Sequence, residues 1–120
     1  MKDTGRIIME PYKGILYCDA YMSDDFSLDD LNAILDEIRE NYAANTDLIL
    51  RKSGTYSVSV DVQMKLFGVV PEFRNIAYVV DNEVKKASAA YAAETYMQSY
   101  KICIAASKEE AYAALADMRR

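Results

Sequence analysis

Four hydroxyl side chains surround a glycine in the middle of this chain, between two apolar runs. The segment from Asp47 to Gln63 reads DLILRKSGTYSVSVDVQ. If the turn at Gly54 leads into a helix, free backbone amides and the helix dipole would favour an anion there, and neighbouring basic side chains would add positive charge. An ordinary strand-to-helix turn with capping hydroxyls is the alternative. The residues of this candidate anion-binding turn are Arg51, Lys52, Ser53, Gly54, Thr55, Ser57 and Ser59.

Ten tyrosines and no tryptophan are the second unusual feature of the sequence. Tyrosine combines apolar area with a hydroxyl, and it is enriched where proteins bind one another. We predict that four of these residues gather at one surface and form a candidate interface. The alternative is that they are amphipathic residues at the edge of the core. The four are Tyr17, Tyr21, Tyr56 and Tyr78.

The residue types argue against several kinds of chemistry. The chain has no histidine, which excludes Ser-His-Asp and Cys-His catalysis and the usual zinc sites. Cys18 and Cys103 lie far apart, each within an apolar run, and are expected to be reduced core residues. No phosphate-binding glycine motif is present. We therefore expect no catalytic residue, no metal site and no cofactor.

The charge balance argues against two classes of partner. There are 14 basic and 19 acidic residues, a net charge of -5, and this acidity would repel nucleic acid and anionic membrane surfaces. No apolar run is long enough for a membrane span, and the start, MKDTGR, lacks the apolar core of a secretion signal. We expect a cytoplasmic protein that does not bind nucleic acid or insert stably into a membrane.

Strands and helices are predicted to alternate along the chain and to position these residues. The clearest helix begins at Ser27, which forms a capping-box pattern with Asp30 ahead of an apolar helical stripe. The order predicts one α/β domain over residues 1–120, with a mainly parallel sheet, an N-terminal antiparallel hairpin and helices mostly on one face. The predicted strands are 6–10, 15–22, 47–53, 75–80 and 100–105, and the predicted helices are 27–42, 83–98 and a last one from residue 107.

Two segments are harder to interpret. Between residues 57 and 67, apolar and polar residues alternate as in a strand, yet Val58, Val62, Leu66 and Val69 also follow a helical stripe. Periodicity alone favours the strand by a small margin. In the helix at 83–98, we predict a packing stripe along one side, with small residues that let the helix lie close to the sheet. That stripe is Val84, Ala87, Tyr91 and Thr95.

The order of elements and several local stretches resemble the bacterial STAS-like proteins related to the sporulation anti-sigma-factor antagonist. The stretches are DLILRKSG before the middle segment, FRNIAYVVDN at the next strand and SKEEAYAAL at the last helix, so the likeness covers almost the whole chain. It implies helices layered on a sheet and a helix over residues 57–67, which we adopt in place of the strand.

The resemblance also implies a regulated serine at the start of the helix after the middle strand. In antagonists of this family a partner kinase phosphorylates that serine, and the surrounding surface docks the partner. By position, the candidates are Ser53, Thr55, Ser57 and Ser59. The family has an Asp-Ser pair followed by glycine at this place, whereas this chain has Arg51, Lys52, Ser53 and Gly54, without the acidic residue.

We therefore expect a non-enzymatic regulatory or protein-interaction module of the STAS-like type. Its partner would be another protein, or a second copy in a homodimer formed through the tyrosine-bearing sheet face. The alternative is a carrier of a small apolar or lipid-like ligand in a cavity between sheet and helices, where the alanines of residues 87–93 would leave room. For an enzyme with carboxylate or tyrosine chemistry, no convergent pair of residues is visible in the sequence.

Overall fold

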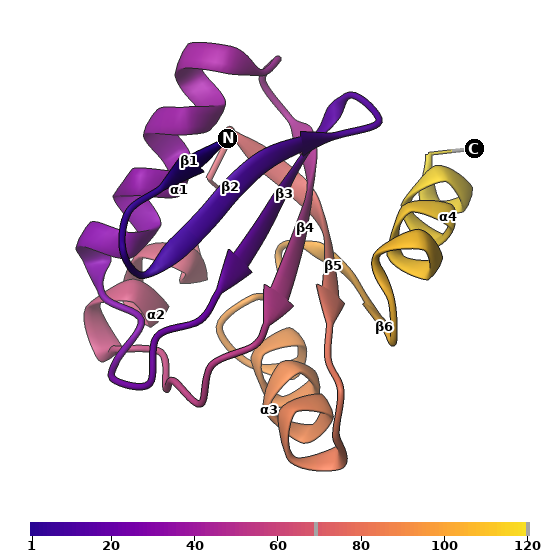
Figure 1. The fold of residues 1–120 in the computed structure, drawn as a ribbon. Helices are drawn as coiled ribbons and strands as arrows, with labels where there is room; N and C mark the ends of the chain where they lie inside the picture. Colours follow the sequence, from indigo (N-terminus) through magenta and orange to yellow (C-terminus); the bar gives the residue numbers. More distant parts are fainter. Residues whose placement is uncertain (69, 120) are drawn as a thin grey trace.

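Within residues 1–68 and 70–119, which the computed structural model describes, six strands form one mixed sheet (Figure 1). They lie side by side in sequence order, antiparallel from β1 to β3 and parallel from β3 to β6. The predicted α/β class with an N-terminal antiparallel hairpin is confirmed, and β1 is an additional strand that was not predicted. The strands are β1 (Lys2–Asp3), β2 (Ile7–Tyr12), β3 (Ile15–Ala20), β4 (Thr46–Lys52), β5 (Phe73–Val79) and β6 (Lys101–Ala105).

The helices cover both faces of the sheet unequally. Because β3 to β6 are parallel and adjacent in order, right-handed crossovers place the three connecting helices on the same face. The last helix follows β6 and packs on the opposite face (Figure 1). In the part of the chain that the structure describes, no helix is both long and apolar enough to cross a membrane. The helices are α1 (Leu28–Asn41), α2 (Val60–Phe67), α3 (Glu83–Glu94) and α4 (Lys108–Met118).

The start of α1 has the predicted capping box. The Ser27 hydroxyl accepts the Asp30 amide at 3.3 Å, and the Asp30 carboxylate accepts the Ser27 amide at 2.9 Å. Arg6, just before β2, donates to both carboxylate oxygens of Asp30, at 2.8 and 3.1 Å. Asp30 is only 5% exposed and the Arg6 side chain is 34% exposed, so this cluster joins the hairpin to the first helix through a partly buried charge pair.

Alternation along the strands divides the core into two clusters. Leu48 and Leu50 of β4 face α1 to α3, whereas Ile49 between them faces α4. Cys18 on β3 belongs to the first cluster and Cys103 on β6 packs against the second, and both thiols are free. The two cysteines therefore lie on separate strands and opposite faces, as expected for reduced residues.

The segment at 57–67 is a helix, as the family resemblance implies, but it begins later than predicted. The Phe26 amide donates to the Ser57 carbonyl at 2.7 Å, and the Ser59 amide donates to the Phe26 carbonyl at 3.1 Å. Residues 57–59 are thus bound in extended form to the loop before α1, which delays the helix until Val60. Val69, the end of the predicted stripe, lies outside the described residues.

The packing stripe predicted for the helix at 83–98 is wrong. Val84 is 80% exposed and Tyr91 is 63% exposed, whereas Ala89 and Ala92 face the sheet. The alanine face lets α3 lie close to the strands. The large side chains that fill the core under this helix come from residues after the helix end at Glu94. Those residues are Tyr96 and Met97, both buried.

Candidate functional site

The turn after β4 is held tightly against the end of β3. The Gly54 amide donates to the Ala20 carbonyl at 3.0 Å. A Cβ atom at Gly54 would lie 1.9 Å from the Met22 carbonyl oxygen, so only glycine fits this approach. Because the Gly54 amide is already hydrogen-bonded, and Gly54 lies well before the start of α2 at Val60, it does not form an anion-binding nest at that helix end.

The two basic residues before the glycine lie on opposite faces of the sheet. Arg51 stands beside Asp19 and Val79 in the strand register and shares the α4 face with them. Lys52, the next residue, points to the face covered by α1 to α3. The two cations therefore do not converge on one anion at Ser53.

The hydroxyls of the turn differ in accessibility. Ser53, Thr55 and Ser57 are exposed, and Ser59 is half-buried directly before α2. The Ser59 hydroxyl donates to the Asp61 carboxylate at 2.6 Å and caps no backbone amide. A modifying enzyme would therefore meet the first three hydroxyls on the surface of the loop.

The four tyrosines of the candidate interface do not share one surface. Tyr17 is buried on the α4 face, where the Lys108 ammonium lies 4.9 Å from its ring centre. Tyr21 is 39% exposed, and its hydroxyl donates to Asp3 at 2.8 Å. Tyr56 and Tyr78 are buried on the other face, where they both approach Lys52.

The outer face of α2 is apolar, which the sequence interpretation missed. Val60, Met64 and Phe67 are 73%, 72% and 70% exposed, whereas Val62 and Leu66 point inward. Apolar residues on both sides of a short helix produce the strand-like alternation seen in the sequence. A short segment that fits both the strand period of two and a helical stripe can therefore be a helix with apolar residues on two faces, one of which stays exposed. That double pattern could have revealed the exposed face.

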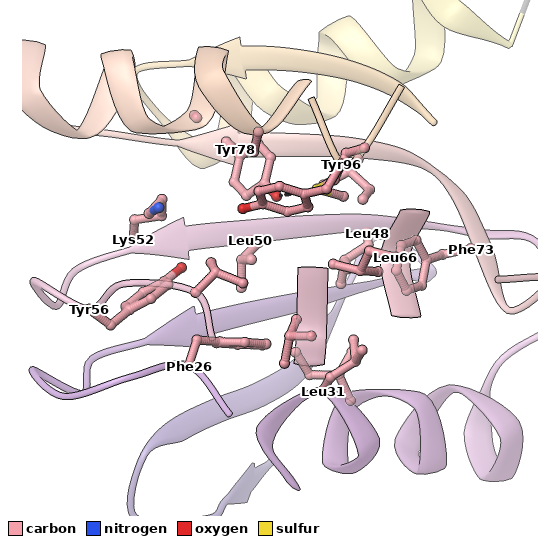
Figure 2. Close-up of a pocket in the computed structure, with 17 residues that line it drawn as sticks. Phe26, Leu31, Leu48, Leu50, Lys52, Tyr56, Leu66, Phe73, Tyr78 and Tyr96 are labelled. Carbon is pink, nitrogen blue, oxygen red and sulfur yellow. Dashed lines mark hydrogen bonds between the residues drawn. The ribbon is translucent and has the colours of Figure 1, made fainter. Parts of the chain in front are cut away.

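A narrow cavity lies between the sheet and the three helices α1, α2 and α3 (Figure 2). Its volume is about 40 Å³, well below the roughly 300–1,000 Å³ of a typical small-molecule pocket. A lipid-sized ligand therefore does not fit unless the lining side chains or helices move. The lining is mainly apolar and includes Leu31, Leu50, Val62, Leu66, Ala89 and Met97.

One end of the cavity is polar. Lys52 is only 6% exposed, and its ammonium lies 4.7 Å from the ring centre of Tyr56 and 5.9 Å from that of Tyr78. The ammonium donates to the Ser88 hydroxyl at 3.3 Å, and no ion pair of Lys52 is found among residues 1–68 and 70–119. Burial, and then the nearby Lys85, lower the pKa of Lys52 below its ordinary value.

Tyr56 contributes a second donor at the same end. Its hydroxyl is buried and has no hydrogen-bond partner within the described residues, and it points into the cavity (Figure 2). Burial raises the pKa of Tyr56, so this hydroxyl stays protonated. The neighbouring Tyr78 hydroxyl is satisfied, because it donates to the Met97 sulfur at 3.0 Å.

Strand phase could have revealed the position of Lys52. In DLILRKS the residue is in phase with Leu48 and Leu50, both of which face the core. An alternating strand therefore places Lys52 on the buried side and Arg51 on the other. The interpretation of Arg51 and Lys52 as one basic pair was wrong because neighbouring residues of a strand point to opposite faces.

Comparison with known proteins adds a fold neighbour. No protein-family model and no curated protein matches the chain. A solved structure from Shewanella loihica PV-4, described as an uncharacterized protein of the DUF3478 family with a SpoIIAA-like fold, has a TM-score of 0.57 over 91% of each chain. The identity is 14%, so the likeness concerns the fold. The chain has a SpoIIAA-like, that is STAS-like, fold, as the sequence resemblance predicts.

Proposed function

We propose that this chain is a non-enzymatic protein-interaction module whose docking surface is the outer face of α2 together with the loop at residues 53–59. The observation that carries this proposal is the exposure of three large apolar side chains, Val60, Met64 and Phe67, on one short helix. Exposed apolar clusters of this kind are typical of sites that bind another protein. The tyrosine-bearing sheet face is less suited to docking, because Tyr17 is buried beside α4.

The loop beside this helix is a suitable place for regulation. Ser53, Thr55 and Ser57 are exposed and precede the apolar face of α2, and Ser59 lies at its edge. A phosphate group there would add roughly two negative charges at the rim of an apolar docking surface. This added charge opposes association with the partner. We therefore retain these four hydroxyls as phospho-acceptor candidates that would release a partner when modified.

Intact-mass measurement tests this regulation. Protein isolated from its native host under several growth conditions should show a phosphorylated fraction, and fragmentation should place the phosphate on one of the four hydroxyls. A chain that stays unmodified under every condition would count against the phosphoswitch, while leaving the docking surface itself to be judged separately.

Replacing Met64 with lysine and Phe67 with glutamine in one double variant should strongly weaken partner binding with little effect on the fold. Both side chains are at least 70% exposed, so the free energy of unfolding should change by less than about 0.5 kcal/mol. Loss of two central apolar contacts should weaken the partner complex by about 30-fold or more. A photo-crosslinking residue at Met64, used in the native host, identifies the partner. Calorimetry with the purified partner then compares the affinity of the double variant with that of the wild type.

The matched control uses α1. Glu40 is an exposed polar residue on that helix, so a crosslinker there, or Glu40→Gln, should leave partner capture and affinity unchanged. Sedimentation at several concentrations separates a foreign partner from a second copy of this chain. Equal crosslinking from Met64 and Glu40, or unchanged affinity in the double variant, would refute the docking surface.

A further inference from the structure

The polar end of the cavity contains two hydrogen-bond donors, and within the described residues no carboxylate accepts from either of them. The Lys52 ammonium is 6% exposed and has only the Ser88 hydroxyl at 3.3 Å as a hydrogen-bond partner among the described residues. The Tyr56 hydroxyl is 7% exposed and unpartnered. Both groups come from the same short stretch of chain, and the Lys52 ammonium lies 4.7 Å from the Tyr56 ring centre.

This arrangement is costly to the folded protein unless something else completes it. A buried ammonium without a carboxylate loses its hydration without a compensating charge. A buried hydroxyl without a partner loses a hydrogen bond that it would make to water in the unfolded chain. An oxygen anion placed between the two groups would relieve both costs at once, because it accepts from each and neutralises the charge.

The rest of the cavity limits what that anion is attached to. Apolar side chains from β4, α1, α2 and α3 line the remaining walls, so the body of the ligand must be apolar. The space of about 40 Å³ must enlarge even for a short chain or a single ring, because a protein cavity that binds benzene has a volume of about 150 Å³. Larger bodies are therefore excluded. Met97, an unbranched and adaptable side chain at this wall, is the best placed to move aside.

We propose that the cavity binds a small apolar monocarboxylate, with its carboxylate accepting from Lys52 and Tyr56 and its apolar body lying between the sheet and α1 to α3. The site is distinct from the outer face of α2 and does not depend on the docking function. Lys52 supplies the charge recognition, and Tyr56 supplies a second, directional hydrogen bond that fixes the carboxylate.

Paired ligands test this assignment on the full-length protein. Butyrate, hexanoate and benzoate are titrated calorimetrically at neutral pH, each beside the alcohol with the same apolar body. At least one acid should bind about tenfold or more tightly than its alcohol, because a hydrogen bond to a charged group is worth more than one to a neutral group. Equal affinities for acid and alcohol would overturn carboxylate recognition, and binding of neither would overturn the site.

Three variants locate the bound acid. Lys52→Met should weaken acid binding about 30-fold or more and leave alcohol binding unchanged. Lys86→Met, at an exposed position on α3, is the charge-matched control and should bind like the wild type. Acid affinity that is unaffected by Lys52→Met, or equally reduced by Lys86→Met, would overturn the proposal.

Tyr56→Phe remains informative if the lysine variant does not fold. It should weaken acid binding about tenfold, yet raise the melting temperature, because it removes a buried hydroxyl without a partner. Opposite changes in binding and stability are expected only of a group held for a ligand. A lowered melting temperature together with unchanged affinity would overturn the role of Tyr56.

Discussion

Replacing Gly54 with alanine is expected to destabilise the protein by about 3 kcal/mol or more, a large share of the roughly 5–15 kcal/mol by which native domains are stable. The added Cβ would lie 1.9 Å from the Met22 carbonyl oxygen and 2.7 Å from the Tyr21 carbonyl carbon. Both are backbone atoms just after the end of β3, so neither can rotate away. Moving the turn instead would break the hydrogen bond from the Gly54 amide to the Ala20 carbonyl.

Gly68→Ala is the matched control for this substitution. At Gly68, the C-cap of α2, an added Cβ meets only the Lys65 carbonyl oxygen, at 4.0 Å, and the backbone has a φ of -86 that any residue adopts. Its effect on the free energy of unfolding should stay within about 0.5 kcal/mol. Urea unfolding followed by circular dichroism compares the two variants, and equal midpoints would contradict the close contact at Gly54.

Asp30→Ala is expected to cost about 2 kcal/mol of stability, from the loss of charge-assisted hydrogen bonds to a partly exposed arginine and of one half of the capping box. The substitution removes the carboxylate that accepts from Arg6 and from the Ser27 amide, and with it the reciprocal half of the capping box. Asp30 is 5% exposed, whereas the Arg6 side chain is 34% exposed and keeps its contacts with Asp24 and the Asp25 carbonyl, so the loss falls mainly on the buried, Asp30 side of the cluster. Thermal and urea unfolding measure the loss directly.

Asp30 also makes the free energy of unfolding depend on pH in the acid range. Burial raises the pKa of Asp30, but hydrogen bonds from Arg6 and Ser27 lower it more, so that the net pKa lies below the ordinary value of 3.8. Its stabilising contribution is therefore complete above that value and is lost as the pH falls through the lowered pKa. Asp30→Ala should lack this part of the acid transition.

Asp24→Ala is the control for the charge pair. Asp24 also contacts Arg6, at 2.9 Å, but its side chain is 71% exposed and solvent screens the interaction. Its stability and acid transition should resemble those of the wild type. If the two variants lost equal stability, the buried position of Asp30 would not be the source of the effect.

The features that the sequence predicted correctly are those that depend on residues close together in the chain. Ser27 and Asp30 satisfy each other across one turn, so α1 begins where the capping pattern indicates. Strand and helix alternation, with right-handed crossovers, was sufficient for the mainly parallel sheet and for three helices on one face. The family resemblance, rather than periodicity, identified the helix within residues 57–67.

The sequence failed where the partner of a side chain is far along the chain. Tyr91 fits a helical stripe, yet it is exposed because Tyr96 and Met97, beyond the helix end, fill the space under α3. The anion-binding turn was inferred from adjacent residues, but the fold separates Arg51 from Lys52 across the sheet and uses the Gly54 amide to hold β3. Adjacency in sequence was a poor guide to adjacency in space.

By itself, then, the sequence determined the class of fold and the capped start of α1, because these follow from residue type and spacing within a few turns of chain. Only the tertiary structure decided that Lys52 and Tyr56 meet at one end of an apolar cavity and that Val60, Met64 and Phe67 remain exposed. The physical reason is that burial depends on which elements pack together. A valine on a helix has the same local pattern whether its face meets the core or the solvent.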